Sequence, residues 1–440
     1  MNIENLKIEK IAMGGMGIGF HGDKAIFVAN TIIGDVVDAT IYLSKKDHAF
    51  AKVHTFHSRG VGYTEPPCEA FTKAEPCGGC DWLMLEYQKQ MEYKENLLKD
   101  LFREHLDIYS GMEAAESSTG YRNKVFMPVG SAGYGIYARY SHEIVAHTNC
   151  QNHPPIFDDI AKAAMDLCVK AGVEPYDELA NKGTLRHIGL RCNRDLSEIL
   201  VVLVCRSSRL PFSKTIVHGL TDRFPMITGI IQNINRDKTN VILGKEEKLL
   251  FGKASLSDRL ADLRYEINYR SFWQINNSTM EKILCAMRSR MKPHFKVIDA
   301  YCGIGSIGLS LAGEISELVG IEEVPEAIND AKLNAKNNGF ENARFICGKF
   351  EEKYEDLIKD FTADCIILDP PRAGVQEGVL WSIRKSGIPL IIYLSCSPMS
   401  LKRDIKILMH EDKYRLTSLS GFDMFPNTWH IESLAILERT

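Results

Sequence analysis

The chain has 440 residues, of which 45% are hydrophobic and 25% are charged, and its formal net charge at pH 7 is −4. This is the composition of a soluble globular protein of two or three domains, with no overall basic charge that would point to nucleic acid. No uncharged apolar run approaches the roughly 18–20 residues that a membrane span needs, and the N-terminus lacks the apolar core of a signal peptide. We therefore predict a cytoplasmic protein without a membrane partner, whose 12 cysteines act as thiols, metal ligands or nucleophiles rather than in disulfides.

Residues 1–57 are expected to form a small β module. Short β-prone runs such as KAIFVAN and GDVVDATIYLSKK are separated by glycine, aspartate and asparagine turns. A closed five-stranded barrel of the OB type buries so few residues efficiently, and such barrels either bind RNA or are purely structural. Residues 58–270 are predicted to be a central mixed α/β domain, with a helix around LEYQKQMEYKENLLKDLFREHL and strands such as SEILVVLVCR.

From residue 271 onward, predicted helices and strands alternate. Strands are expected in FKVIDAYCGIG, ELVGIEE, ARFICGK, ADCIILDPPRAG and PLIIYLSCS, and helices in IGLSLAG and PEAINDAKLNAKNNG. Such alternation predicts a doubly wound, mostly parallel sheet that binds ligands at the carboxyl ends of its strands. We therefore predict an α/β protein whose C-terminal domain, residues 271–440, is Rossmann-like.

A glycine-rich loop follows the first of these strands, in VIDAYCGIGSIG. Gly303 and Gly305 allow the backbone to approach a ligand closely, and Glu322, at the end of the next strand, is placed to bind ribose hydroxyls. NAD-binding proteins share this outline. Three details favour S-adenosylmethionine instead: the loop begins with Asp299, the helix after Glu322 is typical of S-adenosylmethionine enzymes, and the later DPP is similar to the motif with which many methyltransferases hold a planar base.

A cysteine, Cys396, lies just past the last predicted strand, at the edge of the sheet where ligands bind. The alternative to a catalytic role is a small buried thiol that packs below the sheet. A thiolate here is a good nucleophile if a neighbour lowers its pKa or accepts its proton. Addition of the thiolate to C6 of a uracil would let C5 attack a sulfonium methyl, and a base would then remove the C5 proton. The stretch DMFPNTWHIES offers Asp423, His430 and Glu432 as that base.

Three further cysteines, Cys68, Cys77 and Cys80, lie close together in PPCEAFTKAEPCGGCDW. The CGGC unit is a tight turn that points two sulfurs at one metal, and Cys150 is a candidate for the fourth ligand. Four thiolates suit either zinc or an iron–sulfur cluster, and their spacing does not separate the two. The alternative is a set of unrelated buried thiols.

Five stretches of the chain resemble the RNA uracil-C5 methyltransferase family, which includes the 23S rRNA (uracil-C5) enzymes and the tRNA thymine-54 enzyme. They are SFWQIN (271–276), DAYCGIGSIGL (299–309), ILDPPRAG (367–374), YLSCSP (393–398) and DMFPNTWHIES (423–433). The resemblance implies that Cys396 is the nucleophile and Glu432 the base. It also implies that S-adenosylmethionine is bound by Gln274, Tyr301, Glu322 and Asp369, and that Arg372 shapes the substrate pocket.

Two positions depart from the family pattern. Lys349 stands where an acidic or amide residue often faces the adenine, and Trp273 stands where a smaller or different apolar residue is common. Neither touches the thiol chemistry. The other cysteines are expected to serve packing: Cys168, Cys192, Cys205, Cys285, Cys302, Cys347 and Cys365.

The rRNA members of the family carry a 4Fe–4S cluster, and the resemblance places it on Cys68, Cys77, Cys80 and Cys150. Their RNA-binding N-terminal barrel is called a TRAM domain, and the tRNA thymine-54 enzymes in general lack both features. The resemblance thus implies methyl transfer to C5 of a uridine in 23S rRNA, with RNA as the partner and no protein partner. The alternatives are a tRNA uridine-C5 enzyme, an RNA cytosine-C5 enzyme and a noncatalytic RNA-binding assembly factor. An iron–sulfur radical methylase is disfavoured because the C-x-x-x-C-x-x-C spacing is absent.

Overall fold

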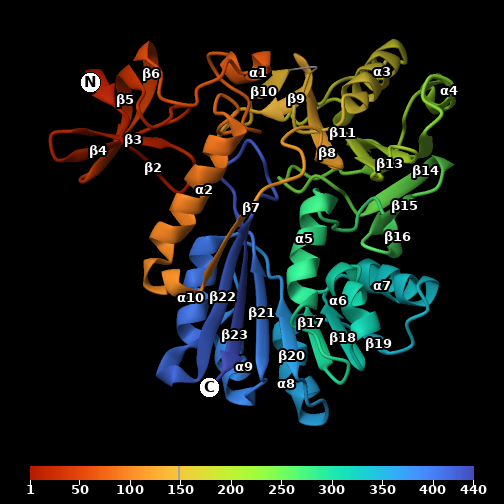
Figure 1. Cartoon of the computed structure of the whole chain (residues 1–440). Coiled ribbons are helices and arrows are strands. Elements are labelled where there is room, and N and C mark those ends of the chain that lie inside the picture. Colours follow the sequence, from red (N-terminus) through yellow and green to blue (C-terminus); the bar gives the residue numbers. More distant parts are fainter. Residues whose placement is uncertain (147–148) are drawn as a thin grey trace.

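The computed structural model describes residues 1–146 and 149–440, and their strands form three large sheets and one two-stranded sheet. Figure 1 shows the N-terminal and central sheets in the upper half of the view and the C-terminal sheet below them. Within the described ranges, no helix is long and apolar enough to cross a membrane.

The N-terminal sheet closes on itself. β1 and β2 lie at the two ends of the strand order β1-β5-β6-β4-β3-β2, yet only Ile8 and Glu9 separate them in the chain. The backbone N–H of Glu9 donates to the carbonyl of Ile18 in β3, at 2.8 Å, and the sheet curls into a small barrel. It has six strands, one more than the sequence predicted. Its strands are β1 (Asn2–Lys7), β2 (Lys10–Ile11), β3 (Gly17–His21), β4 (Lys24–Val28), β5 (Val36–Ser44) and β6 (His48–Ser58).

The central sheet has the strand order β10-β9-β8-β11-β12-β13-β14. β12 is buried along its whole length. Its odd-numbered residues pack in one core with α3 and α4, and its even-numbered residues pack in another with the β15–β16 hairpin. This explains its unbroken apolar run, because a strand covered on both faces shows no alternation.

The bounds of the central elements are α1 (Glu69–Thr72), β8 (Lys124–Gly130), β9 (Gly133–Tyr137), β10 (Ile144–Ala146), α3 (Ile156–Lys170), β11 (Leu185–Cys192), β12 (Ile199–Cys205), α4 (Ser213–Thr221), β13 (Ile227–Ile234), β14 (Glu246–Gly252), β15 (Ser255–Leu260) and β16 (Leu263–Asn268).

The C-terminal sheet has the order β19-β18-β17-β20-β21-β23-β22-β7. Its first five strands are parallel, and β23 runs antiparallel between β21 and β22. Helices cover both faces: Ile366 and Leu368 of β20 pack in one core with α8, α9 and α10, and Ile367 packs in the other with α5, α6 and α7. The predicted alternation of strands and helices is therefore confirmed, and the chain has a mixed α/β fold.

The bounds of these elements are α5 (Asn277–Arg288), β17 (Lys296–Ala300), α6 (Ser306–Leu311), β18 (Glu317–Glu322), α7 (Pro325–Asn337), β19 (Ala343–Cys347), α8 (Phe350–Asp360), β20 (Cys365–Leu368), α9 (Glu377–Ser386), β21 (Leu390–Ser395), α10 (Pro398–Leu408), β22 (Tyr414–Phe422) and β23 (Glu432–Arg439), with short 3-10 helices at Arg103–Ile108, Ala312–Glu314 and His410–Asp412.

Two elements from far upstream also join the C-terminal sheet. β7 (Tyr109–Glu113) pairs with β22 at the sheet edge. α2 (Tyr87–Leu101) runs down from the cysteine region, and its Leu97 and Leu98 share a core with β22 and α10. The sheet is therefore built from two separate parts of the chain. The order along the sheet reverses between β17 and β20, and such a switch point is where doubly wound sheets bind ligands.

Candidate active site

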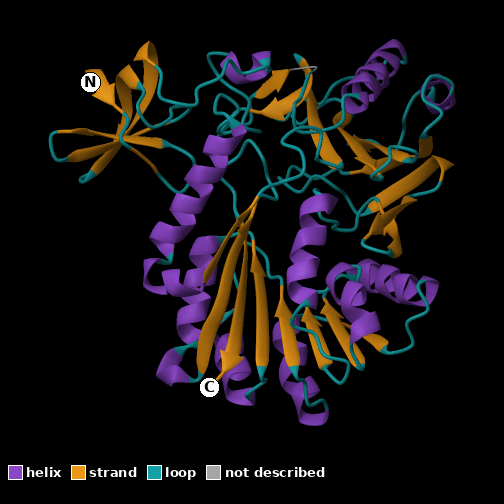
Figure 2. Cartoon of the chain, in the orientation of Figure 1, coloured by secondary structure: helices purple, strands orange, loops and turns teal. Residues whose placement is uncertain are grey.

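The parallel strands of the C-terminal sheet point toward the upper half of the molecule (Figure 2). Their carboxyl ends therefore face the barrel and the central sheet. Cys396 directly follows β21 and precedes α10. Two serines fix its loop: Ser395 Oγ accepts a hydrogen bond from the backbone N–H of Ser397 at 3.1 Å, and Ser397 caps α10 by accepting from the N–H of Ser400.

The strand register brings Cys396 and Glu432 together. β21 and β23 are antiparallel, and Ser395 pairs with Ser433. The next residues in this register are Cys396 and Glu432, so they lie across from one another at the ends of neighbouring strands. Glu432 is buried, with 3% of its surface exposed.

Burial, with the negative charges of Glu432 and Asp369, raises the pKa of the Cys396 thiol to about 11, and Arg372 opposes this shift. Burial also raises the pKa of the Glu432 carboxyl well above its ordinary value, with a further contribution from Asp369. The pKa of Asp369 itself rises to about 7 because its carboxyl is desolvated. The Cys396 thiol therefore interacts electrostatically with the carboxyls of Glu432 and Asp369 and with the guanidinium of Arg372. Such a cluster of groups with shifted pKa values is typical of catalytic sites.

The other two candidates for the base have different surroundings. Asp423 is fully buried, and its Oδ1 accepts from Lys94 Nζ at 2.6 Å. His430 packs against Trp429, with ring centroids 4.4 Å apart, and burial together with nearby cations such as Arg372 lowers its pKa to about 4. Asp423 is thus engaged in a structural ion pair, and Glu432 is the one of the three that the strand register places across from Cys396.

The predicted S-adenosylmethionine residues lie around the carboxyl ends of β17, β18 and β20. Tyr301 has a left-handed backbone, φ 61°, and its hydroxyl donates to Glu351 Oε1 at 2.9 Å. Glu322 Oε2 accepts from the N–H of Gly303 at 3.1 Å, so the carboxylate is held against the glycine-rich loop. Asp299 Oδ2 accepts from the N–H of Gly308 at 2.8 Å and anchors the other end of that loop.

The remaining candidate, Gln274, lies on the segment that leads into α5. It is buried, and its backbone carbonyl accepts a hydrogen bond from Asn123 Nδ2 at 2.8 Å. The nearby Trp273 is 3% exposed and packs against Tyr265, with ring centroids 5.1 Å apart. Trp273 is therefore a core residue. Lys349 is exposed at the start of α8.

One anchor of the site has no signal in the sequence. Asp404 of α10 is fully buried, and its Oδ2 accepts from the N–H of Val375 at 2.9 Å and from the hydroxyl of Tyr393 at 2.6 Å. These bonds fix the DPPRAG loop, and with it Arg372, to β21. A carboxylate in the middle of an amphipathic helix is ordinarily a surface residue, so only the packing shows this role.

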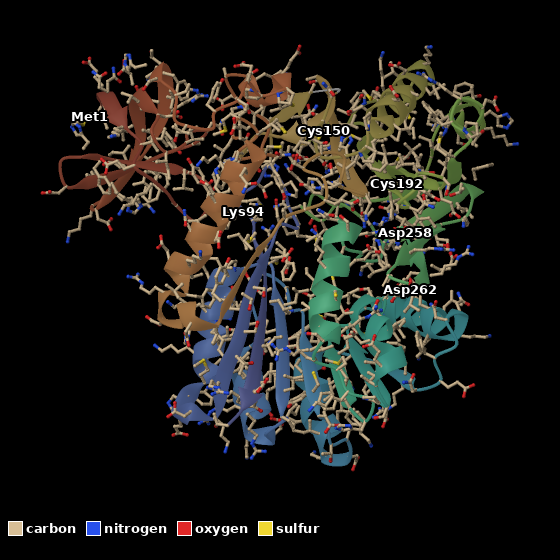
Figure 3. The ribbon with its side chains drawn as sticks, viewed as in Figure 1. Met1, Lys94, Cys150, Cys192, Asp258 and Asp262 are labelled. Atoms are coloured by element: carbon tan, nitrogen blue, oxygen red, sulfur yellow. The ribbon has the colours of Figure 1, made fainter. Side chains whose placement is uncertain are left out.

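The four cysteines of the predicted metal site line one cavity of about 40 Å³, together with apolar residues that include Phe71 and Leu83. Within the described residues, no group of three or more histidine, cysteine or acidic side chains is arranged to hold a metal ion. The structure thus gathers the four predicted cysteines without showing metal-binding geometry. Figure 3 marks the region with Cys150, near the central sheet, and Lys94 on α2.

Burial separates the other cysteines into two groups. Cys168, Cys192, Cys205, Cys302 and Cys365 are buried, as predicted for packing residues, whereas Cys285 and Cys347 are exposed. The packing prediction is therefore wrong for those two. Cys285 lies on the outward face of the amphipathic α5, and Cys347 ends the edge strand β19.

The chain is similar to a family model and to several known proteins. The model of the tRNA (uracil-5-)-methyltransferase family matches residues 221–440. A Clostridium acetobutylicum protein described as an uncharacterized RNA methyltransferase is 36% identical, covering 100% of this chain and 97% of the relative. A Listeria monocytogenes protein of the same description is 35% identical, covering 98% of this chain and 96% of the relative.

The fold also matches a solved structure along almost its whole length. The Pyrococcus abyssi tRNA (uracil-54, C5)-methyltransferase, solved with S-adenosyl-L-homocysteine, has a TM-score of 0.81 and 23% identity, covering 99% of this chain and 100% of that one. A protein named as a tRNA enzyme therefore shares the fold of this chain along almost its whole length. The chain therefore belongs to the RNA (uracil-C5)-methyltransferase family, a family of S-adenosylmethionine-dependent enzymes.

Proposed function

We propose that this protein transfers a methyl group from S-adenosylmethionine to C5 of a uridine in 23S rRNA, in the cytoplasm, to give 5-methyluridine. The observation that carries the proposal is that Cys396 and Glu432 are the next residues after the Ser395–Ser433 pair of β21 and β23. Glu432, Asp369 and Arg372 all interact electrostatically with Cys396. A nucleophile and a base on adjacent strand ends suit a reaction that adds a thiol to a ring and later removes a proton.

The first step is addition of sulfur to the ring. The Cys396 thiol releases its proton to solvent, and the positive charge of Arg372 favours the thiolate. The sulfur then bonds to uracil C6, and the C5–C6 π electrons move onto C5 and O4 as an enolate. C5 attacks the sulfonium methyl, whose bond electrons return to the sulfur of the donor.

Elimination completes the reaction. The Glu432 carboxylate takes the C5 proton, the electrons of that C–H bond restore the C5–C6 double bond, and the thiolate of Cys396 leaves. The raised pKa of Glu432 makes its carboxylate a stronger base than an exposed glutamate, which favours this proton transfer.

The methyl donor is proposed to lie over the carboxyl ends of β17 and β18. Gln274, Tyr301, Glu322 and Asp369 would contact it, with Glu322 on the ribose hydroxyls and Asp369 at the wall between donor and uracil. The hydrogen bond from Gly303 to Glu322 supports this assignment because it holds the carboxylate at the loop that faces the ligand.

The cysteine cavity is proposed to hold a 4Fe–4S cluster on Cys68, Cys77, Cys80 and Cys150. The supporting observation is that the four sulfur-bearing side chains line one cavity with an otherwise largely apolar wall, since four thiolates are the ligand set of such a cluster. The methyl transfer needs no electron, so the cluster would stabilise the fold and position RNA.

Residues 1–57 would act as a TRAM barrel and residues 58–270 as the central domain, both holding RNA for the methyltransferase domain, 271–440.

A tRNA uridine is the second candidate substrate, because the P. abyssi tRNA (uracil-54, C5)-methyltransferase shares the fold along the whole chain. The chemistry would be the same. RNA recognition by shape and by single-stranded loops would decide between the two.

Tritium release tests both substrates. Protein purified without oxygen is mixed with S-adenosylmethionine and with 23S rRNA or tRNA transcripts that carry tritium at uridine C5. Release from 23S rRNA, abolished by Cys396→Ala and retained by Cys365→Ala, would support the proposal. Release from tRNA alone would change the substrate and keep the mechanism. If neither RNA releases tritium, the uridine assignment is contradicted, and a cytosine-C5 enzyme or a noncatalytic RNA-binding factor is favoured.

A further inference from the structure

The β22–β23 loop, residues 423–431, leads directly into Glu432. The side of this loop nearest α2 and α5 is held by Lys94, which donates to Asp423 Oδ1 and to the carbonyl of Phe425 at 3.0 Å, and by Thr279. Nearer its tip, the loop is held at Asn427, which is 4% exposed and bonds Gln90 of α2.

The backbone of Asn427 is fixed to the segment that follows Cys80. Its carbonyl accepts from the N–H groups of Asp81, at 2.8 Å, and of Trp82, at 3.0 Å, and its own N–H donates to Gln90 Oε1 at 2.9 Å. Asn427 adopts φ 64°, in the left-handed region that asparagine tolerates better than other non-glycine residues. The tip of the loop is therefore bonded within two residues of a cysteine of the cavity.

The side chain of Asn427 adds a path to the sulfur itself. Its Nδ2 donates to Asn152 Oδ1 at 3.1 Å. Asn152 Nδ2 in turn donates to Cys80 Sγ at 3.2 Å and to the carbonyl of Gly79 at 3.3 Å. Two hydrogen bonds in series thus connect Asn427 to Cys80. A second connection between the loop and this segment is the hydrogen bond that the N–H of Trp429 donates to Asp81 Oδ2, at 3.1 Å.

We infer that Asn427 is a positioning residue that couples the cysteine cavity to the β22–β23 loop, which carries His430 and leads into Glu432. Its bonds make the position of the loop depend on that of Cys80, because the residues that connect them, Asn427, Asn152 and Asp81, are buried and bonded as described. A change at Cys80, by loss of the thiol or by binding of a metal, would then reach the base. The coupling rests on the contacts alone, and its effect on catalysis rests on the proposed function.

Amide hydrogen exchange tests the coupling without activity. Asn427→Gly keeps the left-handed backbone and removes only the side chain. Asn181→Gly is the matched control, since Asn181 also has a positive φ, 50°, and also accepts one side-chain hydrogen bond, from Tyr176. We expect Asn427→Gly to speed exchange about tenfold in both 423–431 and 77–82, and Asn181→Gly to change neither. Faster exchange in 423–431 alone would overturn the inference.

A second test uses a double-mutant cycle. Asn427→Gly and Asn152→Ala are each expected to slow single-turnover tritium release about tenfold, with S-adenosylmethionine affinity unchanged. The double variant should be no slower than Asn427→Gly alone, about tenfold, because Asn427→Gly already breaks the path that Asn152→Ala removes. Asn427→Gly also breaks the bonds of that side chain to Ser118 and Gln90. A hundredfold loss in the double variant would show independent effects and contradict the coupling. If the wild-type protein releases no tritium, the proposed function fails, and the exchange experiment still decides the coupling.

Discussion

At the scale of single residues, the proposed site rests on two side chains that are 36 positions apart in the chain, Cys396 and Glu432. The antiparallel register of β21 and β23, in which Ser395 pairs with Ser433, brings the two residues to adjacent strand ends. Burial then raises both pKa values. The thiol is consequently protonated at neutral pH until a cation or substrate assists its ionisation, and the carboxylate is a strong base once it forms.

Replacing the base should trap the covalent intermediate. In Glu432→Gln, sulfur addition and methyl transfer proceed but the C5 proton stays in place, so the RNA remains attached to Cys396. Tritium release should fall about 100- to 10,000-fold, and a protein–RNA band should persist in a denaturing gel. Glu438→Gln, on the same strand β23, should behave as wild type. Full loss of release without an adduct would contradict the role of Glu432.

The rate should also depend on pH through Cys396. Its pKa is raised, so the thiolate fraction and the rate of tritium release should increase as the pH rises from 6 to 9. Arg372 lowers this pKa, and Arg372→Met should therefore move the profile about 0.5–1 pH unit higher at saturating RNA. Arg384→Met, which removes the partner of Glu411, should leave the profile in place. An unmoved profile in Arg372→Met would show that another group controls the thiol.

At the scale of elements, α2 is fixed to the C-terminal sheet by a buried ion pair. Lys94 and Asp423 are both fully buried, and 2.6 Å separates Lys94 Nζ from Asp423 Oδ1. The charge attraction in this dry environment opposes the desolvation that lowers the pKa of Lys94. The pair joins a helix upstream of the central sheet to the loop that leads to Glu432.

Breaking this pair should be costly. Lys94→Met leaves Asp423 buried without its cation, and we expect the free energy of unfolding to fall by about 3–5 kcal/mol. Lys99→Met on the same helix removes an exposed pair with Glu95 and should cost less than about 1 kcal/mol. Urea titration followed by tryptophan fluorescence measures the free energy of unfolding of both variants. Equal losses in the two variants would contradict the structural role of the Lys94–Asp423 pair.

At the scale of the whole molecule, the barrel touches the β22–β23 loop and the segment that follows Cys80. The carbonyl of Gly15 accepts from Trp82 Nε1 at 3.0 Å, and a Cβ at Gly15 would lie 3.1 Å from side-chain atoms of Asp81 and Trp429. Three parts of the chain that are distant in sequence therefore meet beside the active site. A disturbance in the barrel can reach Glu432 through this contact.

Neighbouring glycines provide a test with a matched control. Gly14 and Gly15 both have positive φ, 105° and 78°, but a Cβ at Gly14 would meet nothing within 4 Å. Gly14→Ala should cost about 1 kcal/mol of backbone strain and leave tritium release unchanged. Gly15→Ala is strained as well and also displaces Trp429, so release should slow several-fold with S-adenosylmethionine affinity intact. Identical rates in the two variants would show that the contact does not matter for catalysis.

The sequence by itself determined the α/β class, the alternation of strands and helices after residue 271 and the family, because these follow from local periodicity and short contiguous motifs such as YLSCSP. It also named Cys396, Glu432 and the donor-binding residues, whose roles stay predictions. Only the tertiary structure decided that β7 pairs at the edge of the C-terminal sheet and that α2 packs against this sheet. It also decided that Asp404, Lys94 and Asn427 hold the segments around the proposed site. The physical reason is sequence separation: Gln90 and Asn427 bond to each other across 337 positions, and such a pairing leaves no local pattern to recognise.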